Sequence, residues 1–301
     1  MLPLSPKERG DSKIVASNSA IVNSPAAPAL APDAGIRLQR ARGNARISTQ
    51  LRAGTTRLAT LYQDGCAKIR LPNTHSPALE AVLINTAGGL TGGDHIEWSA
   101  DAVAGGHLVL TTQACERSYR STGSIATVRT KLTVGAGAHL DWLPQETILF
   151  TASKLDRRIE IDLAEGASLT AIEAVLLGRD AMGERAEDAY LRDTWRIRRN
   201  GRLVHAEATL LTGTGSERSA APLLAGARAF ATIVHIGPLA AGRLDTIRAL
   251  MPPASTIAAS AIGERLIVRA LADSGLALRR LIVPILTELS GAGTLPRLWH
   301  L

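Results

Sequence analysis

Residues 96–113 read Ile96-Glu-Trp-Ser-Ala-Asp-Ala-Val, then Ala104-Gly-Gly, then His107-Leu-Val-Leu-Thr-Thr-Gln. An alternating segment is followed by a turn with glycine and by a second segment that opens on leucine. The same plan recurs at residues 128–146, 158–173 and 194–207. Alternation with a period of two is typical of half-buried strands, and glycine at the turns supplies the positive φ that tight connections need. One pair of strands cannot bury its apolar face alone, so we expect the units to stack.

This pattern predicts a mainly β fold of stacked antiparallel β-hairpin repeats in two layers. Two arrangements remain open, a solenoid-like stack and a string of hairpins in an ordinary sandwich. The C-terminal third has helical spacing instead, and we expect a few covering helices there, at residues 242–251 and 274–290. Ser274 is the expected N-cap of the second helix, and Pro284 would kink that helix or end its first half. Such helices either cover the sheet or offer a groove to a partner.

Composition limits the class of protein and its organisation. Residues 1–34 are rich in Pro, Ala, Ser and Asn without a hydrophobic period, which predicts a disordered extension. Residues 35–301 should then form a single β-rich domain. The formal charge is +7, but no basic run with interleaved aromatic residues occurs, so we expect no nucleic-acid partner. No apolar stretch is long enough to span a membrane, and two distant cysteines fit a cytoplasmic protein.

The repeats also align polar residues. When the second segments are aligned on Leu108, Leu140, Leu169 and Leu203, polar side chains follow at matching positions. They are Thr112, Gln113, Gln145, Glu146, Glu173 and Glu207. In a stack they would form a polar column, and buried carboxylates are unfavourable unless they are paired, hydrated or bound to a metal. The column would therefore be a path for a divalent ion, or its carboxylates would pair with arginines such as Arg120 or Arg179.

The seven histidines show no HxH or HxxxH spacing and no nearby cysteine pair, so we expect no tightly bound metal. His107, His139 and His205 recur near the glycine turns, and we expect them to be solvated turn residues.

A glycine-rich loop follows the segment that begins at Leu83. The loop does not have GxGxxG spacing, and the residues after it alternate like a strand, which argues against a dinucleotide site. We expect a loop with left-handed glycines that lets backbones approach closely, tethered by Asp94.

Several motifs resemble those of the urease accessory protein UreD family, also called UreH. Asn85-Thr-Ala-Gly-Gly-Leu-Thr-Gly-Gly-Asp is similar to its PGGL-x-GGD segment, although Asn85-Thr-Ala replaces the usual proline. Residues 110–121, 142–150, 176–184 and 295–299 resemble further family motifs in the same order, with Arg117 where lysine is common. The motif residues are Gly88, Gly89, Thr91, Gly92, Gly93 and Asp94 in the loop, and the polar Tyr119, Arg120, Ser121, Arg179 and Glu184.

The resemblance covers residues 36–301 and implies a protein without catalytic turnover. Members of the family act with UreF and the GTPase UreG on urease apoprotein and help to insert nickel. The expected partners are therefore UreF, UreG and urease apoprotein, with no resident cofactor and nickel only in transit. The alternative is a β-repeat interaction adaptor unrelated to metal.

Overall fold

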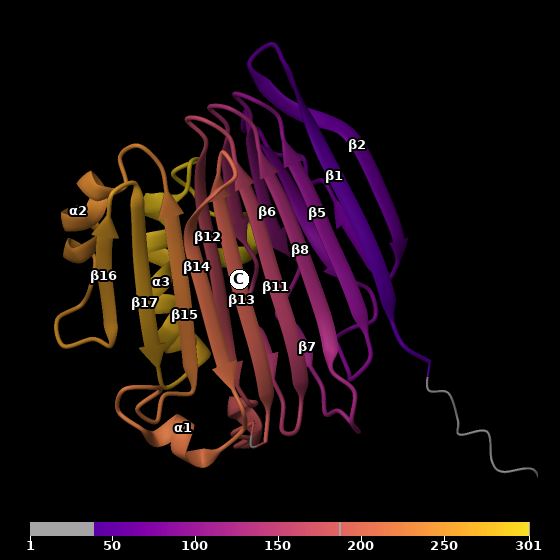
Figure 1. Cartoon of the computed structure of the whole chain (residues 1–301), viewed down its shortest axis with the longest axis vertical. Coiled ribbons are helices and arrows are strands. Elements are labelled where there is room, and N and C mark those ends of the chain that lie inside the picture. The colour runs from indigo at the N-terminus through magenta and orange to yellow at the C-terminus, as the bar shows by residue number, and fades with distance from the viewer. Residues whose placement is uncertain (1–38, 187, 301) are drawn as a thin grey trace, which may run out of the picture. The chain divides into compact units, whose positions relative to one another are not determined.

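The structure is a computed structural model that describes residues 39–186 and 188–300. The chain from Arg40 onward forms one compact unit. The predicted extension, residues 1–34, lies outside the described residues. Two β-sheets pack face to face through a shared core of leucine, isoleucine, valine and alanine side chains (Figure 1).

The first sheet, sheet A, has seven strands in the order β14-β13-β11-β8-β5-β1-β2. Their bounds are β1 (Arg42–Arg52), β2 (Thr55–Gly65), β5 (His95–Ala102), β8 (Ala126–Val134), β11 (Lys154–Leu163), β13 (Tyr190–Arg199) and β14 (Arg202–Leu211).

The second sheet, sheet B, runs in the order β16-β17-β15-β12-β9-β6-β4-β3, and two short strands attach to it through β12. The path strands are β3 (Ala67–Arg70), β4 (Leu79–Asn85), β6 (His107–Thr112), β9 (His139–Leu143), β12 (Ser168–Leu177), β15 (Ala229–Ile236), β16 (Ile257–Ile262) and β17 (Arg265–Ala272). The attached pair is β7 (Glu116–Ser118) and β10 (Thr147–Leu149).

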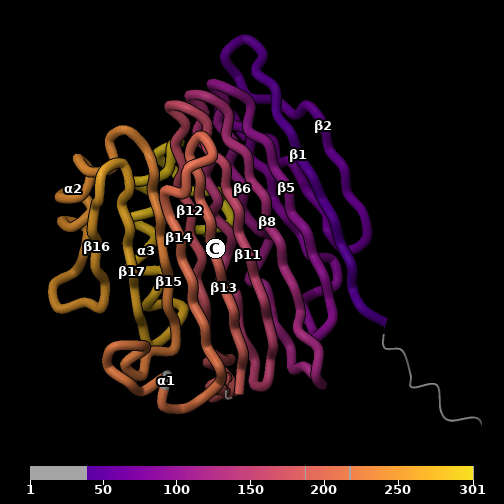
Figure 2. Tube along the Cα trace, viewed as in Figure 1, coloured from indigo at the N-terminus to yellow at the C-terminus, as the bar shows by residue number. Residues whose placement is uncertain are grey.

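The mainly β, two-layer, solenoid-like fold is confirmed, but the two strands of a repeat are not hydrogen-bonded to each other. In each of the first three repeats the first strand lies in sheet A and the second in sheet B, so the chain winds in coils (Figure 2). Strands of successive coils pair in parallel, for example β5 with β8 and β6 with β9. The expected antiparallel hairpins are therefore wrong for these repeats. Their glycine turns are corners between the sheets, where Gly105 N donates to Ala136 O of the next coil at 2.9 Å.

The alignment of the repeats on leucine is confirmed for three of the four. Leu108 is in register with Leu140, and Leu140 with Leu169. Leu203 does not join this row, because β14 turns back beside β13 within sheet A. Asn200 and Gly201 make that turn with positive φ angles of 48° and 78°, as a tight two-residue hairpin requires. The fourth repeat is thus a true antiparallel hairpin that ends sheet A.

One long helix follows in the C-terminal third and covers the outer face of sheet B. This helix, α3 (Gly275–Leu289), packs against β12, β15 and β17 and buries a second apolar core (Figure 1). Ser274 caps it as predicted, since its hydroxyl accepts from Ala277 N, and the helix continues through Pro284 instead of ending there. The remaining short helices are η1 (Asp180–Met182), α1 (Gly215–Ser219), η2 (Ala241–Arg243), α2 (Leu244–Ala249) and η3 (Arg297–His300).

Over the part of the chain that the structure describes, no helix combines the length and the apolar character needed to cross a membrane.

Candidate functional site

The glycine-rich loop 88–94 lies at a corner of the coils and is tethered as expected. Asp94 is buried, and its carboxylate accepts from Thr91 N at 2.7 Å and from Ala41 N at 2.8 Å. Gly88, Gly89 and Gly93 have positive φ. A Cβ on Gly92 would lie 2.1 Å from Ser121 Oγ, so only glycine lets the two corners approach this closely.

The next corner, residues 117–121, holds three of the polar motif residues. Tyr119 donates its hydroxyl hydrogen to Gly88 O at 3.2 Å, and Ser121 Oγ donates to Ser124 O. Thr91 Oγ1 donates to Arg120 O at 2.9 Å, so Arg120 contributes its backbone here. These residues join one corner to the corner before it.

Arg179 and Glu184 lie two corners further along the chain, between β12 and β13. Their ion pair is 2.5 Å long, and the Arg179 guanidinium stacks 4.6 Å from the centre of the Phe150 ring. Burial opposes ionisation of Glu184, but hydrogen bonds from Arg179 and from Thr151 N hold its pKa below the usual value. Phe150 in turn packs edge-on against Tyr119. The motif residues therefore lie at the corners of the coils, where they contact one another from coil to coil.

Two of the six column residues, Gln145 and Glu146, lie in a cluster under α3. Arg279 of that helix donates from Nε to Glu146 Oε1 at 2.6 Å and from Nη2 to Oε2 at 2.9 Å, and also donates to Gln145 Oε1. Cys115 Sγ lies 3.4 Å from Glu146 Oε2. Burial alone would raise the pKa of Glu146, but the bonds and charge of Arg279 lower it. Glu146 is thus an ionised, bidentate partner of arginine.

Glu173 belongs to a different cluster, in the core between the sheets. Arg157 of β11 forms ion pairs with Glu173 of β12 and with Asp193 of β13, the latter at 2.6 Å. Trp142 Nε1 donates to Glu173 Oε1 at 2.9 Å. One guanidinium thus serves two buried carboxylates. Burial and the Asp193 charge outweigh Arg157 and raise the pKa of Glu173 to about 7.

The other three column residues lie elsewhere. Glu207 of β14 pairs with Arg269 of β17 at 2.6 Å and so links the edge strand of sheet A to sheet B. Thr112 accepts from Gln145 N at 2.8 Å, and with the exposed Gln113 it lines a cavity of about 230 Å³ beside Gly88 and Gly89.

The six residues therefore do not form one continuous column. Glu146 contacts Arg279 of α3 on the outer side of sheet B, whereas Glu173 contacts Arg157 and Trp142 in the core on its inner side. The pairing with arginine that we considered as the alternative is present, but the partners are Arg279 and Arg157 instead of Arg120 and Arg179. The sequence contained little indication of these partners. Arg157 occupies an inward-facing strand position, and Arg279 lies on the polar side of a helix.

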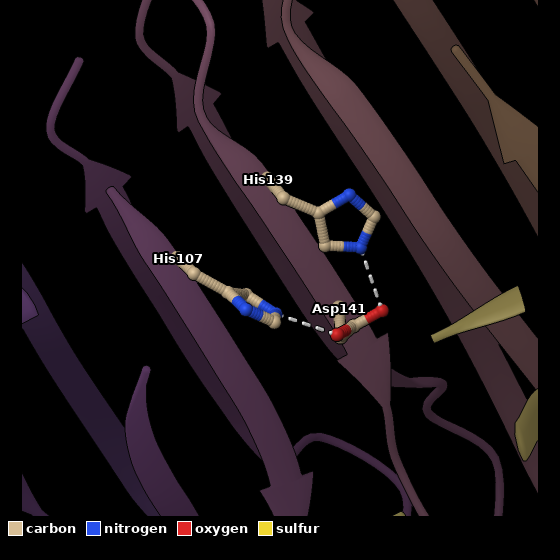
Figure 3. A group of neighbouring side chains, drawn as sticks. All are labelled: His107, His139 and Asp141. Carbon is tan, nitrogen blue, oxygen red and sulfur yellow. Dashed lines mark hydrogen bonds and ion pairs between the residues drawn. The ribbon is translucent and has the colours of Figure 1, made fainter. Parts of the chain in front are cut away.

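A third cluster, which we did not predict from the sequence, lies on the outer face of sheet B. His107 Nε2 is 2.8 Å from Asp141 Oδ2, and His139 Nε2 is 2.9 Å from Asp141 Oδ1 (Figure 3). The expectation of solvated turn residues is wrong for both histidines, because each contacts a carboxylate that is fully buried. The signal was present in the sequence: His139 and Asp141 alternate onto one strand face, and the repeat alignment puts His107 in register with His139.

His205 also differs from that expectation. Its side chain is buried against Trp195, and burial lowers its pKa to about 4. It is therefore a neutral core histidine at neutral pH.

The fold and these clusters define a β-solenoid-like protein with arginine–carboxylate pairs in its interior and the family-like motifs at its corners. Residues 41–300 match the family described as UreD urease accessory protein. The chain therefore belongs to the UreD urease accessory protein family.

Relatives named Urease accessory protein UreD support this assignment along most of the chain. The protein of Chelativorans sp. (strain BNC1) is 61% identical over 264 residues, which are 88% of this chain and 95% of that protein. The Agrobacterium fabrum protein is 51% identical, covering 88% of this chain and 93% of its own. The Rhizobium etli protein is 48% identical, with 88% and 97% covered.

Proposed function

We propose that this protein supports urease maturation as a cytoplasmic scaffold, without catalytic turnover of its own. It would act with UreF and the GTPase UreG on urease apoprotein during insertion of nickel. The observation that carries the proposal is the family match over residues 41–300. The relatives, too, are named as accessory proteins of urease.

The buried carboxylates support a more specific role, in which nickel passes through the chain. The cavity beside Gly88 and Gly89 is lined by Thr112, Gln113, Cys115 and Glu116, and Cys115 contacts Glu146. Burial raises the pKa of Glu116 to about 7, and burial together with the charge of Glu146 raises that of Cys115 to about 11. Oxygen ligands hold a borderline ion such as Ni²⁺ less firmly than imidazole or thiolate does, which suits transit better than storage.

Co-expression tests the proposed function. Urease apoprotein, UreF and UreG are produced with and without this chain, and urease activity and bound nickel are measured in the purified urease. We expect both to fall strongly when the chain is omitted. Full activity and full nickel content in its absence would contradict the proposal and favour an adaptor unrelated to metal.

A further inference from the structure

The cluster of His107, His139 and Asp141 is built from two neighbouring parallel strands. His107 begins β6, and His139 and Asp141 lie two residues apart on β9, so all three project from the outer face of sheet B (Figure 3). One ligand atom from each residue lies within 4.8 Å of the others. Two ligands that are each about 2 Å from a metal ion are at most about 4 Å apart, so small side-chain movements would bring all three into coordination.

The buried Asp141 carboxylate needs a positive charge beside it. Its side chain is 0% exposed, and its ion pairs within residues 39–186 and 188–300 are with the two imidazoles, which are 20% and 16% exposed. Ser290 Oγ and Gly291 N also donate to it, at 3.2 and 3.3 Å. These residues follow α3, whose C-terminal end carries partial negative charge. Histidine alone supplies a full positive charge only when it is protonated, whereas a dication supplies it at any pH at which the imidazoles are neutral.

A second contact orients one of the imidazoles for binding. His139 Nδ1 lies 2.6 Å from Ser168 Oγ, which leaves Nε2 directed at the carboxylate. If Nδ1 donates its hydrogen to Ser168, the lone pair of Nε2 faces Asp141 Oδ1, and a proton or a metal ion must lie between the two acceptors. Metal-bound histidines characteristically have such an outer partner on the second ring nitrogen. Gly291 packs directly on the ring, because a Cβ there would be 2.4 Å from His139 Cδ2.

Access from solvent is available beside the cluster. A cavity of about 320 Å³ is lined by Val109, which is in register with Asp141, and by Ala292, which follows Gly291. His75, Glu80 and His300 line the same cavity. An ion would thus meet further nitrogen and oxygen ligands before it reached the buried carboxylate.

We propose that His107, His139 and Asp141 bind one divalent ion of the late first-row transition metals through two imidazole nitrogens and one carboxylate. This donor set suits Ni²⁺, Zn²⁺ and Co²⁺ better than Mg²⁺ or Ca²⁺, which prefer oxygen ligands alone. Three protein ligands leave positions for water, so the ion can be exchanged. The identity of the ion as nickel rests on the proposed function, whereas binding of such an ion rests on the cluster alone.

The test is titration of the purified full-length chain, stripped of metal, with Ni²⁺, Zn²⁺ and Mg²⁺ by calorimetry. We expect Ni²⁺ and Zn²⁺ to bind at one equivalent that Mg²⁺ does not occupy. Asp141→Asn keeps an oxygen that can accept from Ser290 and Gly291 but lacks the charge, and we expect it to weaken this binding at least about tenfold. His107→Gln combined with His139→Gln should abolish it. His95→Gln is the matched control, since His95 contacts Thr127 and Glu97 on sheet A.

Unchanged Ni²⁺ affinity in Asp141→Asn and in the double histidine variant would overturn the site. The absorption spectrum of Co²⁺ bound to the wild-type chain decides the matter if these variants do not fold. Intense visible bands of four- or five-coordinate Co²⁺ support the site, and the weak spectrum of octahedral aquated Co²⁺ contradicts it. Urease is not needed in this assay, so its failure would leave the proposed function standing, and the co-expression result does not decide it.

Discussion

Glu146 and Glu173 are both buried carboxylates with arginine partners, yet their surroundings shift their pKa values in opposite directions. Arg279 binds Glu146 through two hydrogen bonds and lowers its pKa. Arg157 is shared between Glu173 and Asp193, so burial is not fully offset and the pKa of Glu173 rises to about 7. The ratio of cations to carboxylates, more than burial itself, decides which of the two is ionised at neutral pH.

This difference predicts a pH-dependent effect of Glu173→Gln on stability. The usual glutamate pKa is 4.5 and the folded-state pKa is about 7, so between these values the folded chain binds more protons than the unfolded chain. The unfolding free energy therefore falls as the pH rises through this window. Glutamine resembles the protonated acid, so the variant should match the wild type near pH 5 and be the more stable protein near pH 8, measured by thermal or urea unfolding.

Glu160→Gln is the control for this experiment, because it removes a carboxylate from β11 on the outer face of sheet A. A Glu173→Gln variant that loses stability relative to wild type as the pH rises from 5 to 8 would show that the pair with Arg157 outweighs burial.

Sequence alone indicated that Glu146 and Glu173 would be buried but not which side chains they would meet. The alternation of polar and apolar residues and the alignment of the repeats depend on the order of residues within each segment. Both can therefore be read directly from the sequence. Arg279 lies 133 residues from Glu146 and reaches it only because α3 folds back over sheet B. The same limit applies to Asp141, whose contact with Gly291 spans 150 residues.

At the scale of elements, the repeat pattern predicted which residues align but not how the strands pair. An alternating strand, a glycine turn and another alternating strand describe a hairpin and a solenoid coil equally well. The choice depends on which partner the second strand pairs with, either the first strand of its own repeat or the corresponding strand of the next coil. The residues of a single repeat do not specify that partner. Both faces of β12 are almost wholly buried, as is typical of strands in parallel sheets. Strand β14 alternates with an exposed face, consistent with its place at the edge.

The cap of α3 was predictable because it depends on local chemistry, and it leads to a second prediction. Ser274 Oγ accepts from Ala277 N, which would otherwise lack a partner at the helix start. Ser274→Ala should lower the unfolding free energy by about 1 kcal/mol, measured by urea unfolding. Because α3 carries Arg279 and buries Leu278 and Ile282, fraying of its first turn would also loosen the Glu146 cluster.

Ser260→Ala is the matched control, since Ser260 is exposed on β16 and its replacement should change stability by no more than about 0.5 kcal/mol. Equal effects of the two substitutions would show that the cap contributes nothing beyond a surface serine.

At the scale of the whole molecule, successive contacts connect three features. They are the corners that carry the family motifs, the cavity lined by Gln113 and the cluster around Glu146. The corner loop 88–94 borders the cavity, and Cys115 joins the cavity to Glu146. Glu173 lies beyond this chain, in the core between the sheets, where Trp142 and Arg157 hold it. The loop and corner motifs thus form the framework of the structure, and the two carboxylates lie in separate clusters, each held by arginine.

The last prediction concerns urease activation by a variant in which Glu146→Gln and Glu173→Gln are combined. Glutamine retains the shape of each side chain and one acceptor oxygen, but it replaces the other oxygen with an amide NH2 and removes the negative charge that attracts a dication. If nickel passes these positions, urease matured with the variant should contain less nickel and be less active, while the variant still assembles with UreF and UreG. Assembly is measured by co-purification, and nickel by elemental analysis of the purified urease. Glu160→Gln in the same assay should leave nickel content unchanged. Normal nickel content with the double variant would show that these carboxylates act only as partners of Arg279 and Arg157, and lost assembly would assign them a structural role.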